Sequence, residues 1–480
     1  MRFSTGTRVA ALASVWLSFT SALPGLGHDN DDVITRDVAI IGGGASGTYA
    51  AIRLRELGRS VALIEQRDEL GGHTHTYYDA AAPIDYGVWI YTNNTDMERF
   101  FAHFNIPLVA EILNGDPAYT RRYDFRTGEA VAALGGNIID ALTRYVGILL
   151  QHPYLAGGFD LPDPVPEDLL LSFGDLIEKY DLGAAVDMIT QFDQGFAENI
   201  LDYPSIYILK YLDLAVIQGI QFGFSRPASR ANQDLYKAAE AELGEDALLG
   251  STVARIQRQD DKGTSAHHKD TNAHHKGTSA HHIVVDTPSG KQRIIANKVI
   301  VAIPPLLENL DGFDLDDRES DIFSRFQYSS YYGSVVNVTG LPRQLQIFNK
   351  ATDTPYHVAD LPGTFTFNPT AVEGIHTGFF GGGAGSLPED QARQGIIDNL
   401  LALRNAGYPV SEPEIIALRS HTPFGLHVSA EEIAGGFYRD LYGLQGYRGM
   451  YYTGAAFHAH NSAELWEFTE RVLQEHVLVD

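Results

Sequence analysis

The pattern of apolar and polar positions near the start of the chain predicts a strand, a helix and a second strand in close succession. Residues 37–41 (DVAII) and 60–64 (SVALI) are short apolar runs of the kind that is buried in a parallel sheet. Between them, residues 48–57 have helical spacing, and Gly58 follows as a helix terminator. Two buried parallel strands joined by a helix are therefore expected here.

The turn between the first strand and the helix has the pattern G-x-G-x-x-G, formed by Gly42, Gly44 and Gly47. Gly42 allows the tight turn, Gly44 lets the backbone approach a pyrophosphate, and Gly47 lets the helix pack close to the strand. Ala45 and Ser46 belong to the helix N-terminus, where unpaired N–H groups and the helix dipole favour negative charge. Because the motif lies in register with both strands, it predicts a Rossmann-type dinucleotide site rather than a structural loop.

Glu65 closes the second strand, where its carboxylate can accept hydrogen bonds from a ribose diol. An adenine dinucleotide is therefore the expected ligand. Gly71 and Gly72 follow soon after, and this pair resembles the G-G extension of FAD-binding oxidoreductases of the amine-oxidase superfamily. In that superfamily the pair brings backbone against the flavin end of the cofactor, so the resemblance favours FAD over NAD.

The pattern then changes to helical spacing and back to strands. Residues 97–219 read as helical, most clearly at 138–150 and 173–182, and predict a substrate or cap region. Residues 252–256 and 283–286 are expected to be antiparallel neighbours.

The C-terminal half continues with strands. Residues 299–303 form a further buried strand, and residues 326–427 predict a second sheet that floors the substrate cavity. Residues 449–454 then form a strand that ends at glycine, and a final helix opens at Asn461 with a good cap.

We therefore expect an α/β fold in which a Rossmann-type FAD-binding domain is interleaved with a mixed sheet-plus-helix substrate domain. The expected divisions are a signal peptide at 1–22, FAD-binding parts at 34–96, 236–305 and 429–480, a helical substrate or cap region at 97–235, a low-complexity His-rich insert at 261–282, and a substrate-domain sheet at 306–428.

Composition narrows the functions. The chain has 35 basic and 61 acidic residues, a formal net charge of −26, which disfavours nucleic acid and anionic membrane surfaces as partners. It contains no cysteine, which excludes disulfides, thiolate metal sites, a cysteine nucleophile and a cysteinyl-linked flavin. FAD is therefore expected to bind non-covalently, with attachment through another residue type as the alternative.

The N-terminus predicts a secretory signal peptide. Arg2 and Arg8 precede an apolar stretch at 9–19, which small residues follow. The stretch is too short for a stable membrane anchor, so a secreted protein or one of the secretory pathway is expected, with an uncleaved anchor or a disordered tail as lesser alternatives. Sequons at Asn93 and Asn337 would permit glycosylation on that route.

Three further patterns have two interpretations each. His73 and His75 are compatible with a metal site, but a hydrogen bond to cofactor or backbone is favoured for a histidine in the G-G segment. Three His-His pairs at 263–282 are compatible with a transition metal, but a low-complexity hairpin is favoured. The glycine-rich residues 380–386 imitate a second dinucleotide loop without matching it, so NADPH is not expected.

Nearly the whole mature chain resembles the amine-oxidase superfamily. Residues 208–213, 427–429 and 445–446 are similar to stretches of the polyunsaturated fatty acid isomerases, and the signal segment makes the chain more similar still to FAD-dependent oxidoreductases of fungal secondary metabolism, the β-cyclopiazonate dehydrogenase family. Two departures from the superfamily are Ala82-Pro83, where the bacterial isomerases carry an arginine, and Ala455, where many members have an acid.

This resemblance implies further cofactor contacts. An acid-x-Gly segment lies beside the isoalloxazine ring in the superfamily, a strand residue meets the adenine, and the last helix N-terminus faces the flavin pyrimidine. The residues carried over in this way, with the histidine of the G-G segment, are His73, Asp85, Gly87, Val88, Val253, Gly454 and Ser462.

The resemblance also implies hydride transfer from an activated C–H to flavin N5. The favoured hypothesis is oxidation of a small natural-product intermediate, by dehydrogenation or oxidative cyclisation. The alternatives are a redox-neutral double-bond isomerase, a flavin amine oxidase and a non-enzymatic flavin carrier. His427 is the candidate proton acceptor, with a structural role as its alternative, and the aromatic residues considered for stabilising a substrate cation are Trp89, Tyr91, Tyr207 and Tyr452.

Overall fold

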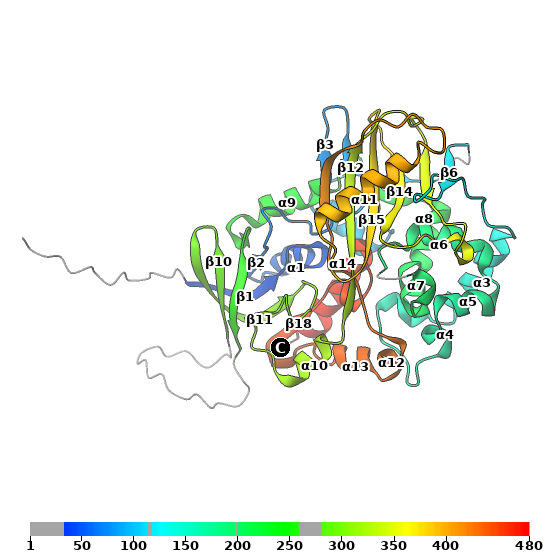
Figure 1. The fold of residues 1–480 in the computed structure, drawn as a ribbon. Coiled ribbons are helices and arrows are strands. Elements are labelled where there is room, and N and C mark those ends of the chain that lie inside the picture. The colour runs from blue at the N-terminus through cyan, green and yellow to red at the C-terminus, as the bar shows by residue number, and fades with distance from the viewer. Residues whose placement is uncertain (1–32, 114–117, 197–198, 259–279, 480) are drawn as a thin grey trace, which may run out of the picture.

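The computed structural model describes residues 33–113, 118–196, 199–258 and 280–479 of the 480-residue chain. Two seven-stranded sheets form its framework, and a group of short helices lies beside them (Figure 1). The predicted signal peptide at 1–22 lies outside the described residues, so it stays a prediction. Within the described ranges, no helix is long and apolar enough to cross a membrane.

The first sheet carries the predicted Rossmann-type unit. Its strand order is β8-β2-β1-β11-β10-β9, with β18 also paired to β11. β1 pairs in parallel with β2, and β9 pairs antiparallel to β10, as the sequence predicted. β1 also pairs in parallel with β11. The helix α1 (Ala45–Glu56) joins β1 to β2. The strands are β1 (Val33–Ile41), β2 (Val61–Ile64), β8 (Ala247–Leu248), β9 (Thr252–Gln257), β10 (His281–Thr287), β11 (Gly290–Val301) and β18 (Met450–Tyr452).

The C-terminal helix α14 (Ser462–Val472) packs against α1. Trp466 on α14 is fully buried, and its Nε1 donates a hydrogen bond to the carbonyl oxygen of Ala45 at 3.1 Å. The helices α2 (Thr95–His103) and α9 (Gln233–Leu243) pack on α14 and α1 respectively. The end of the chain therefore fixes the start of α1, next to the glycine turn.

The second sheet separates a helix-covered face from a cavity face. Its order is β16-β12-β15-β14-β13-β6, with β17 also paired to β12, and α11 (Glu389–Ala402) covers one face. Because side chains alternate along a strand, Tyr332 and Phe380 pack with the α11 residues whereas Tyr331 and Phe379 line the cavity. The strands are β6 (Thr120–Tyr123), β12 (Gln327–Asn337), β13 (Gln346–Asn349), β14 (Gly363–Pro369), β15 (Ile375–Ala384), β16 (Glu414–Ser420) and β17 (Phe424–His427).

The remaining elements close the molecule around these sheets. The two most strongly periodic segments are helices as predicted, at α3 and α5. The helices are α3 (Ile138–Leu149), α4 (Glu167–Leu170), α5 (Phe173–Tyr180), α6 (Val186–Phe192), α7 (Ser205–Tyr211), α8 (Leu214–Phe222), α10 (Asp317–Phe323), α12 (Ala430–Ala434) and α13 (Phe437–Tyr442). Two small antiparallel pairs join β3 (Thr76–Tyr78) to β4 (Pro83–Asp85) and β5 (Leu108–Glu111) to β7 (Phe224–Pro227).

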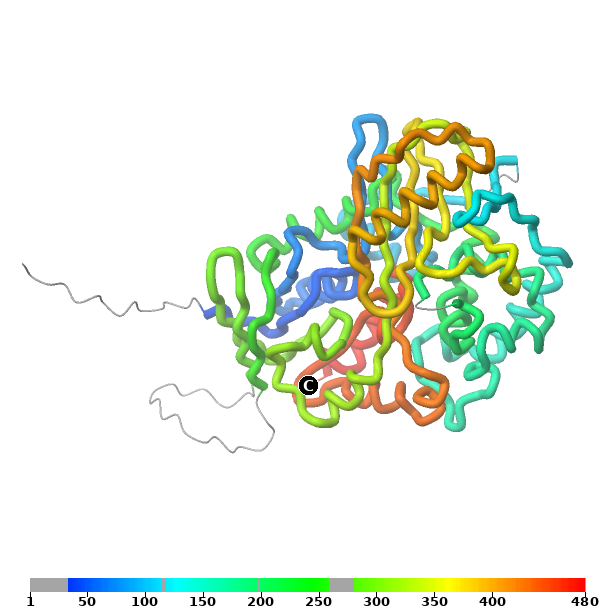
Figure 2. The backbone as a smooth tube through the Cα atoms, viewed as in Figure 1, coloured from blue at the N-terminus to red at the C-terminus, as the bar shows by residue number. Residues whose placement is uncertain are grey.

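The structure differs from the sequence prediction between residues 97 and 235. This region, predicted to be helical, also contains β5 and β6, and β6 joins the second sheet beside β13 (Figure 2). A short parallel pairing between distant segments leaves no local periodicity, so the pattern did not reveal it. The expected domain boundary after residue 235 falls inside α9.

The structure describes part of the predicted His-rich insert and all of the glycine-rich segment. Most of the predicted His-rich insert lies outside the described residues, but His281 and His282 belong to β10, where His281 is buried. The glycine-rich residues 380–386 lie largely in β15 and form a strand rather than a dinucleotide turn.

A buried ion pair fixes the strand β18, which leads into the cavity. The guanidinium of Arg258 donates from Nη1 and Nη2 to the two carboxylate oxygens of Glu319, at 2.6 and 2.9 Å, and both side chains have no exposed surface. Tyr452 on β18 donates its hydroxyl to the same carboxylate at 3.2 Å. The pair therefore links the end of β9 to α10 and β18.

Replacing Glu319 by Gln will lower the free energy of unfolding by more than about 2 kcal/mol, because the buried guanidinium of Arg258 then keeps only the carboxylate of Asp314, which is one-third exposed, as its counter-charge. Chemical denaturation measures this change. The control is Glu432→Gln, which removes a partly exposed pair with Arg325 and will change stability by less than about 1 kcal/mol. Equal effects of both substitutions would contradict the assignment.

Candidate active site

A cavity of about 1490 Å³ is lined by both sheets and by the helical region. Pockets for one drug-sized ligand usually measure about 300–1,000 Å³, so this cavity has space for a dinucleotide and a second molecule. We call its two parts the cofactor arm and the substrate arm. The cofactor arm is lined by Gly42, Gly44, Ala45, Ser46, Glu65, Arg67, Gly71, Gly72, Val253, Gly454 and Ser462, and the substrate arm by Tyr119, Thr120, Arg122, Gln191, Phe192, Tyr211, Tyr331, Gln346, Phe348, Asn368 and Phe379.

The glycine turn after β1 is packed too tightly for side chains at two of its three motif positions. A Cβ on Gly47 would lie 1.8 Å from the carbonyl oxygen of Gly42, and one on Gly42, which has φ +103°, would lie 2.7 Å from Ile303. Gly44 differs, because the nearest heavy atom to its Cβ position would be 3.7 Å away. Gly47 therefore shapes the turn, while Gly44 leaves open space in the cavity.

The start of α1 offers unused hydrogen-bond capacity to that space. No side chain caps this helix at Gly44. The hydroxyl of Ser46 is buried and has no hydrogen-bond partner among the described residues. Backbone N–H groups at a helix N-terminus together with an unpaired hydroxyl suit a phosphate group. The cofactor arm thus fits a dinucleotide pyrophosphate at this point.

Glu65 is held in place at the end of β2. Its Oε2 accepts a hydrogen bond from the Gly43 N–H at 2.6 Å, and its Oε1 accepts one from the Arg67 N–H at 2.8 Å. The side chain is buried but lines the cavity. Since each carboxylate oxygen has a second lone pair, the fixed carboxylate can still accept hydrogen bonds from a ribose diol.

Backbone contact brings the second glycine pair and the acid-x-Gly segment together. Gly72 has φ +58°, and its Cβ position lies 2.8 Å from the Cα of Gly44. A Cβ on Gly87 would lie 1.9 Å from the carbonyl oxygen of His73, which also accepts the Val88 N–H at 3.1 Å. Of the residues predicted in these two segments, Gly72, His73, Gly87 and Val88 line the cavity and Asp85 does not.

The chain's last strand and helix complete the cofactor arm. Gly454 has φ +110° and follows β18 at the cavity wall. Asn461 caps α14 by accepting the Ala463 N–H at 3.2 Å, and Ser462 beside it lines the cavity. Ala455 also lines this wall, so the carboxylate that many superfamily members place there is replaced by a methyl group.

The structure places Asp85 away from the cavity surface, unlike Gly87 and Val88 of the same segment. Its buried carboxylate accepts hydrogen bonds from Arg226 Nη2 and from the Asn232 N–H, both at 3.0 Å, and it does not line the cavity. Asp85 therefore ties the β3–β4 hairpin to the start of α9. The motif brings backbone to the cavity at Gly87 and Val88, while its acid supports the fold.

The structure does not place His427, the candidate proton acceptor, among the residues that line the cavity. Its Nδ1 donates to the Gly425 carbonyl oxygen at 2.8 Å, and its ring packs against Tyr203 at 4.6 Å between centroids. In β17, Phe424 and Leu426 line the cavity, so the alternation of the strand turns His427 to the other side. These contacts favour the structural role that the sequence analysis gave as the alternative for His427.

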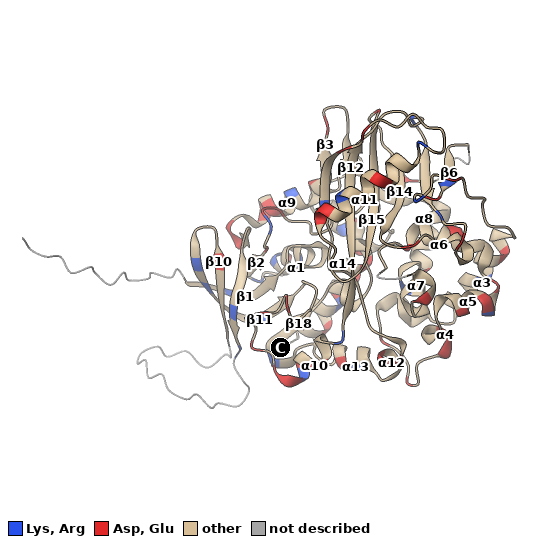
Figure 3. Cartoon of the chain, in the orientation of Figure 1, with Lys and Arg blue, Asp and Glu red and all other residues tan. Residues whose placement is uncertain are grey.

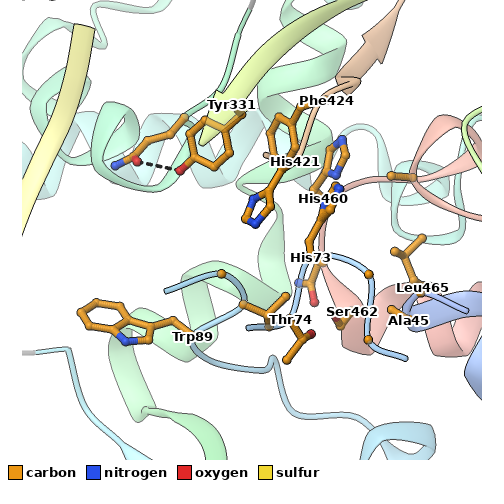
Figure 4. A pocket seen from close by; sticks show the side chains of 18 of the residues that line it. Ala45, His73, Thr74, Trp89, Tyr331, His421, Phe424, His460, Ser462 and Leu465 are labelled. Carbon is orange, nitrogen blue, oxygen red and sulfur yellow. Dashed lines mark hydrogen bonds between the residues drawn. The ribbon is translucent and has the colours of Figure 1, made fainter. Parts of the chain in front are cut away.

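Three other histidines meet in the cavity, and the sequence analysis missed two of them. His73, His421 and His460 come from distant segments and face one space (Figure 4). The rings of His73 and His421 stack at 4.5 Å, and His460 stacks on Phe424 at 3.8 Å. A clue existed for His460, which lies between Gly454 and the cap Asn461 in a segment already assigned to the flavin end.

These histidines are uncharged at neutral pH. Burial lowers the pKa of His460 to about 4, and it lowers the pKa values of His73 and His421 well below the ordinary range. The Nε2 of His460 accepts the Gly425 N–H at 2.9 Å, so its proton is held on Nδ1. His460 is thus fixed as a donor at Nδ1.

Aromatic residues form much of the substrate arm, but of the four proposed from the sequence only Trp89 is among the described residues that line the cavity. Trp89 lines the cavity. Tyr91 instead stacks on Trp466 in the core, Tyr207 donates to the Val428 carbonyl oxygen, and Tyr452 is bound to Glu319. The aromatic side chains that do line the arm are Tyr119, Phe192, Tyr211, Phe224, Tyr331, Phe348, Phe379 and Phe424.

Among the described residues, no group of three or more His, Asp or Glu side chains could hold a metal ion.

Comparison with known proteins agrees with this geometry. Residues 40–104 match a family model described as an NAD(P)-binding Rossmann-like domain. The chain is 38% identical to the FAD-dependent oxidoreductase dbaF of Emericella nidulans, over 93% of this chain and 92% of that one. It is 36% identical to the β-cyclopiazonate dehydrogenase of Aspergillus oryzae, over 94% of each.

Solved structures share the fold. The fatty acid isomerase of P. acnes superimposes with a TM-score of 0.71 at 20% identity, covering 92% of this chain and 98% of the other. A putrescine oxidase superimposes with a TM-score of 0.62 at 18% identity, covering 92% and 99%.

Fold and site together define an oxidoreductase with a Rossmann-type cofactor domain and a separate substrate sheet. The chain belongs to the family of FAD-dependent oxidoreductases that includes dbaF and β-cyclopiazonate dehydrogenase. Its cofactor is FAD, and the cysteine-free sequence is consistent with non-covalent binding.

Replacing Gly47 by Ala will strongly reduce the FAD content of the purified protein, because the new methyl group collides with the Gly42 carbonyl and displaces the turn. The ratio of flavin to protein absorbance measures this content. Gly147→Ala is the matched control, since nothing lies within 4 Å of its Cβ position in α3. Full FAD content in the Gly47 variant would contradict the assigned cradle.

Proposed function

We propose that this enzyme oxidises a natural-product intermediate of secondary metabolism, by dehydrogenation or by oxidative cyclisation. FAD, when bound, supplies the acceptor for a hydride. The observation that carries the proposal is the cavity itself, in which a dinucleotide cradle opens onto an arm with aromatic walls. Relatives that are 36–38% identical over more than nine-tenths of the chain are named oxidoreductase or dehydrogenase, which supports net oxidation.

The walls of the substrate arm favour a conjugated or polycyclic substrate. Flat aromatic side chains bury large apolar area and stack on unsaturated rings. Amide side chains, including Gln191, Gln194 and Asn368, add hydrogen-bonding groups without charge. Tyr331 donates its hydroxyl to Gln194 Oε1 at 3.1 Å, which fixes one of these amides (Figure 4).

The same walls disfavour an amine substrate. Among the described residues, the acidic side chains that line the cavity are Glu65, which follows β2, and Glu308, which follows β11, and we assign both to the cofactor arm. Across the described part of the substrate arm, an ammonium group would meet no carboxylate. A buried cation without a counter-charge is costly, so a flavin amine oxidase has little support.

A redox-neutral isomerase has less support than an oxidase or dehydrogenase. Its solved relative is only 20% identical, so the likeness concerns the fold. Ala82 and Pro83, which stand where the bacterial isomerases carry arginine, lie at the β3–β4 hairpin and do not line the cavity.

We assign proton acceptance to His421 within this proposal. It lines the cavity, its Nε2 is buried and has no hydrogen-bond partner among the described residues, and its ring stacks on His73. A neutral imidazole can take the proton of a substrate O–H or N–H while a neighbouring C–H is oxidised. His460, whose proton is held at Nδ1, would orient the substrate by donating a hydrogen bond.

A secretory route remains part of the proposal and rests on residues 1–22. The two sequons differ in their surroundings. The Asn93 amide donates from Nδ2 to the Gly223 carbonyl oxygen at 3.0 Å and accepts the Ser225 hydroxyl at 2.6 Å. Asn337 is exposed at the end of β12. Asn337 is therefore the better acceptor for a glycan.

Mixing the holoenzyme anaerobically with fractionated metabolite extract of the producing organism tests the reaction class. One fraction will bleach the visible flavin absorbance, and the colour will return only when air is admitted. A fraction that is converted to an isomer without net loss of electrons would contradict oxidation.

With that fraction as substrate, His421→Phe will slow flavin bleaching by about 10²–10⁴-fold, because the ring stack is kept and the proton acceptor is lost. His427→Phe is the control and will leave the rate largely unchanged. Stopped-flow absorbance under anaerobic conditions measures both rates, with flavin content confirmed first. A slow His427 variant and a normal His421 variant would reverse the assignment.

A further inference from the structure

One charged side chain in the wall of the substrate arm, Arg122, is unexplained by cofactor binding. Strand alternation in β6 turns Thr120 and Arg122 to the cavity, while Arg121 between them is exposed. β6 lies at the edge of the second sheet and is a basic segment (Figure 3). The other charged residues that line the cavity, Glu65, Arg67 and Glu308, belong to the cofactor arm.

The charges around Arg122 do not cancel. Asp187 on α6 accepts the Nε–H of Arg122 at 2.5 Å, and it also pairs with Lys350 Nζ at 2.7 Å. Lys350 and Asp187 are both buried. Burial alone would raise the pKa of Asp187. The two cations outweigh this effect and hold the pKa below its usual range, so the carboxylate stays ionised. Two cations therefore share one anion, which leaves a net positive charge beside the cavity.

The hydrogen bond of the Arg122 side chain leaves the two Nη groups of its guanidinium available. Within the described chain, its hydrogen bond is the one from Nε to Asp187, and 24% of its side chain is exposed. The cavity-facing residues of the adjoining strands are uncharged, with Gln346 Nε2 donating to Asn368 Oδ1 at 2.8 Å. A guanidinium presents paired N–H groups that match two oxygens of a planar anion.

We infer that Arg122 forms an anion site in the substrate arm, which takes a carboxylate or a similar planar pair of anionic oxygens on the substrate. This inference rests on the proposed function, because it describes the substrate of the same cavity. The buried pair of Asp187 and Lys350 holds the guanidinium in place, and the aromatic walls enclose the rest of the molecule. The substrate class is thus an aromatic or polycyclic acid rather than a neutral compound or an amine.

A matched pair of ligands tests the anion site without turnover. The probes are 4-phenylbutanoate and 4-phenylbutanamide, which differ in charge and share their shape. Each is titrated into the oxidised holoenzyme, and binding is followed by the shift of the visible flavin spectrum and by isothermal calorimetry. The acid will bind at least about tenfold more tightly than the amide, as a charge-assisted bidentate contact requires. Equal affinities, or no binding of the acid, would overturn the proposal.

Two substitutions that each remove one positive charge test whether the preference for the acid depends on Arg122. Arg122→Gln will lower the affinity for the acid by about tenfold, to that for the amide, and will leave the affinity for the amide unchanged. Arg121→Gln, on the outer side of the same strand, changes the net charge equally and will preserve the preference for the acid. Flavin content and melting temperature are compared for both variants. If Arg121→Gln abolishes the preference or Arg122→Gln retains it, the site is not at Arg122.

The outcome is separable from that of the proposed function. A preference for the acid that is lost in Arg122→Gln supports the anion site even if no metabolite bleaches the flavin. Conversely, a metabolite that bleaches the flavin equally fast in Arg122→Gln and in the unmodified enzyme, with unchanged half-saturation, supports oxidation and overturns the anion site.

Discussion

The structure depends on close backbone contact at a few glycines. The glycine turn after β1 touches its own helix at Gly47, and the segment around Gly87 lies against the His73 carbonyl. Neither contact leaves room for a Cβ atom. These approaches bring the end of β1, the G-G pair and the acid-x-Gly segment together, so the cofactor arm is built mainly from backbone. The helix α14 then holds the turn in place through the hydrogen bond from Trp466 to the carbonyl oxygen of Ala45.

The second sheet supplies what the cradle lacks. Its strands alternate between the α11 side and the cavity, so the same elements build a core and a substrate wall. Histidines from three distant segments meet where the two arms join, and burial keeps them neutral. The wall of the substrate arm is largely aromatic or amide-bearing, and Arg122 is the charged residue among its described side chains. We therefore assign cofactor binding to the first sheet, and substrate binding to the second sheet together with the helices α6 and α7.

The sequence predicted what local patterns encode. The strands of the Rossmann-type unit, the glycine turn, Glu65 and the cap at Asn461 each carry a signal within a few residues. Most of the predicted FAD contacts line one cavity for this reason. The prediction from sequence failed where pairing between distant segments determines the structure. The partner of β6 follows more than 200 residues later, so neither that strand nor Arg122 was recognised. His427 was proposed because the pattern did not show which face of β17 meets the cavity, and His421, which lies between β16 and β17, carries no local signal.

The central claim is that a backbone cradle holds FAD in one arm and leaves the aromatic arm for substrate. A crystal structure of the holoenzyme tests it most directly. The account predicts density for the FAD pyrophosphate at the first turn of α1 beside Ser46, with the flavin ring toward His73 and Gly454 and the arm at Arg122 free of cofactor. Cofactor density in the arm lined by Arg122, Phe348 and Phe379 would contradict it.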